Sequence, residues 1–188
     1  MSEPPKKRLR IGNTKYVPKP VDQSQSRLLQ LSDDVLLEIL KILSSHQLLV
    51  LSETCKRLET LCLDTRSLWV DVDFTGHPMD IKSMKRVLKM LHNRTQSLTL
   101  EGFLGQRKSN ISESLLSELV ETCPNLKRLK LYKFYMQADK IQLKLLPKTL
   151  THFSLAGSEL CNLPSDKENG YFKDIHHHLP NLEVLDLQ

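Results

Sequence analysis

Three adjacent histidines at 176–178 and four cysteines are the residues whose types could hold a metal ion or attack a substrate. Cys55, Cys62, Cys123 and Cys161 lie 7, 61 and 38 residues apart, which matches no zinc motif. Consecutive histidines on a helix point about 100° apart and are not expected to converge on one ion. The sequence also lacks the motifs of phosphate loops, serine hydrolases and zinc proteases. It therefore predicts no catalytic residue, no metal site and no cofactor.

Positive charge is concentrated at the N-terminus. Residues 1–30 contain seven basic and two acidic side chains, which accounts for the whole net charge of +5, and the remainder of the chain is balanced. A nucleic-acid-binding fold needs a basic footprint on its folded body, so this distribution disfavours nucleic acid as a partner of the fold. The compact cluster of Lys6, Lys7, Arg8 and Arg10 is either a nuclear localisation signal or an ordinary solvated charge run.

The cellular compartment is predicted from the character of the N-terminus and from the length of the apolar runs. The first residues are charged where a secretory signal would be apolar, and no run of 18 apolar residues could span a membrane. We therefore expect a protein of the nucleus and cytoplasm, with no membrane partner and with reduced cysteines that are small buried hydrophobes.

Three regions of different character follow along the chain. Residues 1–29 are rich in proline and polar residues and predict a disordered basic arm. Residues 30–69 predict a small helical module: Ser32 is a suitable N-cap, and leucine and isoleucine then recur at helical spacing. The module carries more apolar side chains than it can cover alone, so a partner or the region behind it must cover the rest.

Residues 70–188 contain a repeated pattern. The sequence L-x-x-L-x-L occurs at 126–131 and 182–187, each time after a Pro-Asn lead-in, and a related pattern occupies 150–155. The predicted strand centres are 26, 31, 24 and 32 residues apart, close to the leucine-rich-repeat period of roughly 20–29 residues. Those centres are Val72, Leu98, Leu129, Phe153 and Leu185. With helices expected at 80–92 and 112–122, the fold class is α/β: a helical module followed by about four strand–helix units, apparently truncated within the last strand.

Residues 31–40, LSDDVLLEIL, are similar to the opening of the F-box motif, L-P-x-E/D-x-L-L-x-I-L/F. The later apolar, C-K-R and L-W signatures of the motif correspond to Leu43, Leu48, Leu49, Ser52, 55–57 and 68–69. Together with the repeats, the chain resembles the F-box/leucine-rich-repeat proteins over about residues 31–188. Ser32 replaces the usual proline and Leu58 the common tryptophan. The serine keeps the N-cap and the leucine keeps an apolar contact, so we expect the docking mode of the family.

The resemblance implies a non-catalytic receptor subunit of an SCF-type ubiquitin-protein ligase. Its F-box would bind a Skp-family adaptor, which connects to a cullin and a ring-finger subunit, and its repeats would hold an unknown protein substrate. Ubiquitination, leading to degradation, would then depend on proximity alone. Two alternatives stay open: a truncated repeat scaffold that occupies the adaptor without ligation, and a nuclear protein that binds nucleic acid through its basic arm.

Candidate contact residues follow from the apolar excess, from the resemblance and from strand alternation. Trp69 is expected to pin the helical module to the first repeat, because a tryptophan at a domain junction buries a large area. Some of the adaptor candidates are alternatively internal core, and the outward strand residues are alternatively ordinary solvated side chains. The predicted adaptor contacts are Leu31, Leu36, Ile39, Leu40, Leu43, Leu48, Leu51, Cys55 and Leu58. The predicted substrate contacts are Thr99, Glu101, Arg128, Lys130, Tyr132, His152 and Ser154.

Overall fold

The computed structural model describes residues 26–103, 111–163 and 170–188. The chain divides into two compact units, Met1–Ser32 and Asp33–Gln188. In the first unit, the described residues form one short 3-10 helix, η2 (Arg27–Gln30). All the other elements lie in the second unit, which holds both the helical module and the strands. The boundaries predicted from the sequence at residues 29 and 69 stay a prediction.

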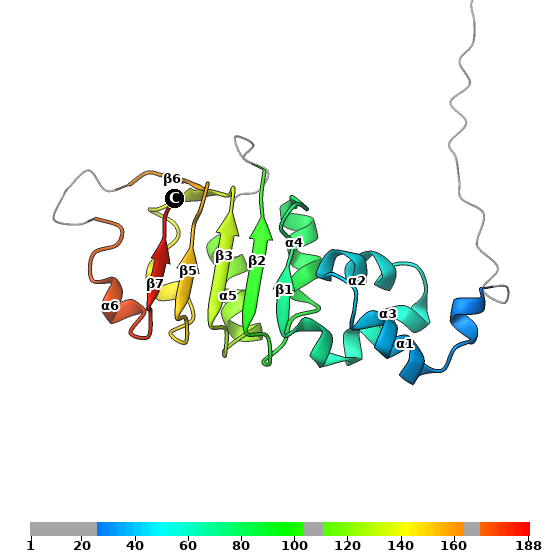
Figure 1. The fold of residues 1–188 in the computed structure, drawn as a ribbon. Coiled ribbons are helices and arrows are strands. Elements are labelled where there is room, and N and C mark those ends of the chain that lie inside the picture. Colours follow the sequence, from blue (N-terminus) through cyan, green and yellow to red (C-terminus); the bar gives the residue numbers. More distant parts are fainter. Residues whose placement is uncertain (1–25, 104–110, 164–169) are drawn as a thin grey trace, which may run out of the picture. The chain divides into compact units, whose positions relative to one another are not determined.

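The helical module contains three α-helices and a closing 3-10 turn (Figure 1). These are α1 (Asp33–Leu40), α2 (Ser45–Ser52), α3 (Lys56–Asp64) and η3 (Arg66–Trp69). Ser44 begins α2 with a capping box, in which its hydroxyl accepts from the Gln47 N–H and the Gln47 side chain accepts from the Ser44 N–H. The polar residues 44–47 therefore form the start of a helix.

Residues 45–64 form two helices, α2 and α3, with a break at residues 53–55. The Ser52 hydroxyl donates to the Leu49 carbonyl at 2.6 Å, and the Thr54 hydroxyl donates to the Leu51 carbonyl at 2.7 Å. Such side-chain bonds compete with the backbone ladder and favour a helix end. The chain consequently turns between α2 and α3.

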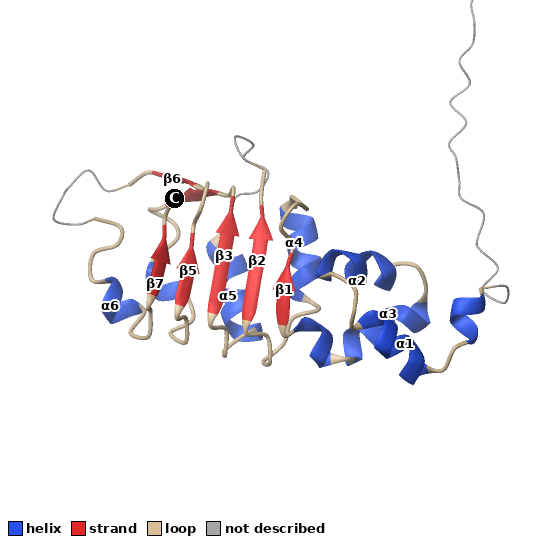
Figure 2. Ribbon diagram, viewed as in Figure 1, coloured by secondary structure: helices blue, strands red, loops and turns tan. Residues whose placement is uncertain are grey.

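A five-stranded parallel sheet follows, with helices and turns on one of its faces (Figures 1 and 2). In sheet order the strands are β1 (Asp71–Asp73), β2 (Ser97–Glu101), β3 (Arg128–Tyr132), β5 (His152–Ser154) and β7 (Val184–Asp186). The connections contain α4 (Ile81–Leu88), α5 (Glu113–Thr122), η5 (Leu143–Leu145) and α6 (Ile175–His178). A smaller sheet pairs β4 (Tyr135–Gln137) with β6 (Glu159–Cys161). The predicted α/β fold is confirmed.

The five predicted strand centres lie side by side. Val72 pairs with Leu98, Leu98 with Leu129, Leu129 with Phe153, and Phe153 with Leu185. The first four are buried on the helix side, whereas Leu185 is 37% exposed on β7, which is the last strand of the sheet among the described residues. Helices begin where expected, because the Asp80 and Ser112 side chains cap α4 and α5.

The repeated Pro-Asn lead-in ties each turn of the array to the preceding one. The Asn125 amide donates to the Asn93 carbonyl at 2.9 Å, and the Asn181 amide donates to the Lys148 carbonyl at 2.8 Å. Each bond satisfies a turn carbonyl that no strand reaches. The motif therefore positions successive strands. Among the described residues, no helix is both long and apolar enough to cross a membrane.

Candidate functional site: an outward apolar stripe and the open strand face

Helix α1 carries two apolar stripes, one facing inward and one facing outward. Leu36 and Leu40 are 1% exposed and belong to the interior of the module. Val35, Ile39 and Ile42 follow the same spacing one residue out of phase, at i, i+4 and i+7. Val35 is 46% exposed, Ile42 is 81% exposed and Ile39 is half-buried. This outward stripe is apolar surface that the module does not cover.

The nine predicted adaptor contacts divide by burial. Leu36, Leu40, Leu48 and Leu58 are 1 to 3% exposed, so these four fill the internal core and offer almost no side-chain surface to a partner. The half-buried members are Ile39, Leu43, Leu51 and Cys55, and Leu31 of the first unit is exposed. Adaptor contact remains a prediction for these five.

Sequence reasoning missed four exposed apolar residues of the helical module, one of which is Leu63 on α3, 37% exposed. Val35 and Ile42 belong to the outward stripe, and Val50 on α2 is 51% exposed. The signal was present, because α1 and its following turn are apolar on both sides. Periodicity alone cannot say which side faces the core.

The C-K-R signature has a structural role in the module. Arg57 donates to one carboxylate oxygen of Asp33 through Nε at 3.0 Å and through a terminal nitrogen at 2.5 Å. This ion pair joins the start of α3 to the start of α1, and both side chains are partly exposed. It contributes little to the stability of the fold, since exposed pairs contribute only about 0–1 kcal/mol.

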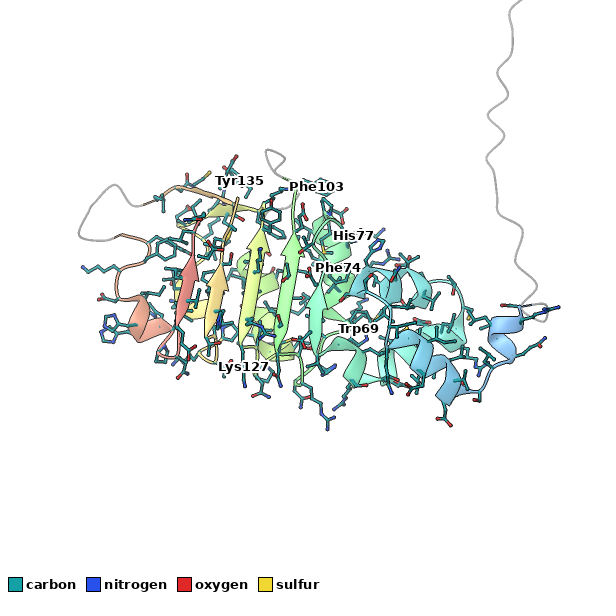
Figure 3. The ribbon with its side chains drawn as sticks, viewed as in Figure 1. Trp69, Phe74, His77, Phe103, Lys127 and Tyr135 are labelled. Atoms are coloured by element: carbon teal, nitrogen blue, oxygen red, sulfur yellow. The ribbon has the colours of Figure 1, made fainter. Side chains whose placement is uncertain are left out.

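Trp69 lies between the helical module and the strands (Figure 3). Its side chain is fully buried. Its indole N–H donates to the Cys62 carbonyl at 2.8 Å, and its own carbonyl accepts from the Thr95 hydroxyl at 2.8 Å. One residue therefore bonds to α3 on one side and to the turn before β2 on the other.

A second set of contacts joins α2 to β1. The Ser45 hydroxyl accepts from the Asp73 N–H at 3.0 Å. The rings of His46 and His77 stack in parallel with their centroids 3.7 Å apart. Through these contacts and those of Trp69, the helical module and the strands form one continuous core.

The open face of the sheet carries six of the seven predicted substrate contacts. A hollow of about 270 Å³ lies over β2, β3, β5 and β7. Arg128 is held at 3.0 Å from Asp71, and the Ser154 hydroxyl donates to Asp186 at 2.9 Å. This face therefore offers a mixed, internally paired polar surface. The six residues are Thr99, Arg128, Lys130, Tyr132, His152 and Ser154.

Glu101 differs from the other strand residues, since it is only 4% exposed. Its carboxylate accepts from the Gly76 N–H at 2.6 Å and from Lys133 Nζ at 3.0 Å. Burial raises the pKa of Glu101, but these hydrogen bonds outweigh burial and hold the pKa below its ordinary value. The same bond raises the pKa of Lys133. Glu101 therefore closes the end of β2 and presents little surface to a substrate.

Tyr132 is the one aromatic side chain among the predicted substrate contacts. It is half-buried, and the ammonium groups of Lys130 and Lys133 lie 5.4 and 4.5 Å from its ring centroid. A Cβ placed on Gly157 would approach its Cε2 atom to 3.0 Å, so this glycine lets the ring pack closely. The ring is thereby fixed between two cations at the rim of the sheet.

The cysteines and the three adjacent histidines were considered from the sequence as possible nucleophiles or metal ligands. Burial raises the pKa of Cys62, and it raises that of Cys123 to about 11, which disfavours both thiols as nucleophiles. Asp174, His176 and His177 place one ligand atom each within 4.8 Å of one another. The expected divergence of the histidines is therefore incomplete for His176 and His177, which lie on the four-residue helix α6. Asp174, in a left-handed backbone conformation, precedes this helix. All three side chains are exposed. The basic cluster at 6–10 lies outside the described residues.

Comparison with known proteins agrees with this architecture. Residues 29–75 match the F-box-like family. F-box/LRR-repeat protein 12 of Homo sapiens is 35% identical over 136 residues, which are 71% of this chain and 41% of the relative. The protein of the same name from Mus musculus is 34% identical over 144 residues, 75% of this chain and 43% of the relative. That from Bos taurus is 34% identical over 133 residues, 69% and 40% respectively.

Among solved structures, the Chaetomium Mex67:Mtr2 subunits are similar with 22% identity and a TM-score of 0.47, over 70% of this chain and 90% of that chain. The chain spans about two-fifths of the length of the curated relatives. Residues 29–75 are an F-box-like domain, and the resemblance of the chain to F-box/leucine-rich-repeat proteins is confirmed. The sequence motifs also predict a likeness to the twelfth member of that family, which the three relatives confirm.

Proposed function

We propose that this chain is a non-catalytic substrate-recognition subunit of an SCF-type ubiquitin-protein ligase. Its F-box-like domain would bind a Skp-family adaptor, and through the adaptor a cullin and a ring-finger subunit. Its strand face would hold a protein substrate for ubiquitination and degradation. The chain would raise the local concentration of a substrate lysine near the ubiquitin donor, without a covalent step of its own.

The observation that carries this proposal is the outward stripe of Val35, Ile39 and Ile42. A helix that is apolar on both sides needs cover on both sides, and the core of the module supplies only one. The stripe follows helical spacing on an F-box-like domain, which is the form of an amphipathic helix that docks into a partner's groove. Val50 on α2 adds exposed apolar surface within the same domain.

The rigid union of domain and strands supports the second half of the proposal. The bond from the Thr95 hydroxyl to the Trp69 carbonyl and the Arg86–Glu53 ion pair connect the F-box-like domain to the repeats that follow it. A receptor that works by proximity needs its two binding surfaces held at a constant separation. The nearby His46–His77 stack adds a further contact across the junction.

The test is co-expression of the full chain with a Skp-family adaptor, followed by size-exclusion chromatography and reconstitution with a cullin–ring-finger complex. We expect a stoichiometric complex, and adaptor-dependent ubiquitin transfer to a client captured through the strand face. A soluble chain that never co-elutes with the adaptor would contradict the proposal. Co-elution without transfer to any bound client would instead support a repeat scaffold that occupies the adaptor.

The basic cluster of the arm leads us to propose that the protein is present in the nucleus as well as the cytoplasm. Replacing Lys6, Lys7, Arg8 and Arg10 by alanine in a fluorescent fusion tests this directly. Nuclear signal should fall in the variant, and an unchanged distribution would leave the cluster as a solvated charge run.

A further inference from the structure

The exposed face of α4 is a stripe of positive charge. Lys82, Lys85, Arg86 and Lys89 follow one another at i, i+3, i+4 and i+7, and all four are exposed. Arg86 pairs with Glu53 at 2.9 Å. Among the residues that the structure describes, no carboxylate lies within ion-pair distance of the three lysines. The three lysines therefore form no ion pair there, and Lys82 interacts only at longer range with Asp80, the N-cap of α4.

The helix dipole does not account for this stripe. Cations are favoured near the C-terminus of a helix, where Lys85, Arg86 and Lys89 lie. Lys82 lies in the first turn, where the dipole disfavours a positive charge. The stripe thus extends along the whole helix at some cost to its N-terminal end.

A groove of about 460 Å³ runs beside the stripe, between α4 and the helices α2 and α3. Leu49, Leu63 and Met90 give it an apolar lining, and Arg86 and Lys89 line its α4 side. Leu63 is exposed, so the apolar lining is accessible. The groove can therefore receive an apolar side chain next to a row of cations.

The acidic residues of the groove are already paired. Glu53 bonds to Arg86, and Glu59 accepts from Lys56 at 2.9 Å. The charge left over beside the groove is that of the lysines of α4. A ligand that complements this surface carries carboxylates along one side and an apolar residue at its centre.

We propose that the groove and the α4 stripe form a second docking surface, which binds a carboxylate-rich segment of a partner protein through an apolar anchor. This surface is additional to the outward stripe and the strand face of the proposed function, and it shares one residue, Cys55, with the predicted adaptor contacts. A protein segment fits better than nucleic acid, because an extended polyanion would meet the neighbouring helix α5. That helix has no lysine, arginine or histidine and exposes Glu113, Glu118 and Glu121.

The test uses the full chain, alone and in complex with the adaptor. The probe is a fluorescein-labelled peptide, Glu-Glu-Leu-Glu-Glu-Leu-Glu-Glu, and binding is followed by fluorescence anisotropy at increasing salt. In the triple variant K82E/K85E/K89E, affinity should fall by at least about tenfold, because each exposed charge contact contributes some two- to threefold. A peptide with glutamine in place of glutamate should bind as weakly as the variant does.

The matched control reverses three exposed lysines elsewhere, in K140E/K144E/K148E, and so has the same net charge. It should bind the acidic peptide like the unaltered chain. Equal affinity of the two triple variants, or no binding by the unaltered chain, would overturn the proposal. Tighter binding of a single-stranded oligonucleotide through the α4 lysines would replace it with nucleic-acid binding. Adaptor co-elution is measured for every variant, so a failure of the proposed function is seen separately.

Discussion

Ile42 offers the sharpest test of the adaptor surface, because 81% of it is exposed in the free chain. Full burial of an isoleucine side chain is worth roughly 1.5–3 kcal/mol, so about 1–2 kcal/mol is available from covering Ile42. In Ile42→Asp that gain is lost, and a carboxylate buried against apolar surface adds a further penalty of about 1–3 kcal/mol. We expect adaptor affinity to fall by about 2–5 kcal/mol, or roughly 30- to 5,000-fold.

The assay is titration calorimetry of the purified chain against the adaptor, with thermal unfolding measured in parallel. Ile42→Asp should leave the unfolding free energy within about 0.5 kcal/mol, since the side chain is exposed. Leu40→Asp buries a charge in the core and should abolish folding as well as binding. Leu163→Asp makes the same polarity change at a residue that is 53% exposed outside the helical module, and it should bind normally. Unchanged affinity of Ile42→Asp would refute the outward stripe as the adaptor surface.

Three further predictions concern the fold, each measured by urea unfolding of the full chain. Glu101→Gln should cost about 1–3 kcal/mol and Glu159→Gln almost nothing, because only Glu101 is buried with hydrogen-bonded partners. Its lowered pKa means that its stabilisation is present above the unfolded-state pKa of roughly 4.3 and is lost as pH falls through the folded-state pKa, so the two curves should converge in acid. Equal unfolding of both variants at pH 7 would contradict this role. Gly157→Ala should lower the free energy of unfolding by about 1–2 kcal/mol, because the φ of Gly157 is +64° and a Cβ would meet a tyrosine ring at 3.0 Å. The control Gly170→Ala places its Cβ in open space and should not destabilise the protein. Similar losses in the two variants would refute the contact. Trp69→Phe should lose about 1–3 kcal/mol with the indole hydrogen bond left unmade, and an unchanged midpoint would show that the bond is dispensable.

The five strands of the main sheet could be predicted from the sequence, whereas the smaller sheet of β4 and β6 was not predicted. Leucines two residues apart place one face of each strand against the helices, so the register follows from the pattern itself. All five predicted centres, from Val72 to Leu185, consequently pair in the expected order. The helices at 81–88 and 113–122 could also be predicted, since each begins after a capping side chain.

The candidate site was harder to predict from the sequence, because the exposure of a side chain depends on tertiary contacts. Strand alternation places Glu101 outward with Thr99, yet the Gly76 turn and Lys133 cover its carboxylate. Lys133 reaches it from a left-handed backbone position, with φ of 56°, which no local propensity predicts for a lysine. The alternation of inward and outward side chains predicts exposure within a strand, but it does not predict it for Glu101 at the strand end.

In helix α1, too, the sequence pattern alone cannot tell which residues are buried and which are exposed to a partner. The spacing of Leu36, Leu40 and Leu43 and that of Val35, Ile39 and Ile42 are identical, so each set alone describes one amphipathic helix. Only packing on α3 decides that the first set faces inward.

The helical module carries more apolar side chains than it can bury itself, and the structure shows which of them the repeats bury. The repeats cover the module through Trp69 and through the contact of α2 with β1. Val35 and Ile42 on the α1 side receive no such cover and stay exposed. The part of the excess that the array does not bury is therefore the surface where a docking partner would gain most from hydrophobic burial.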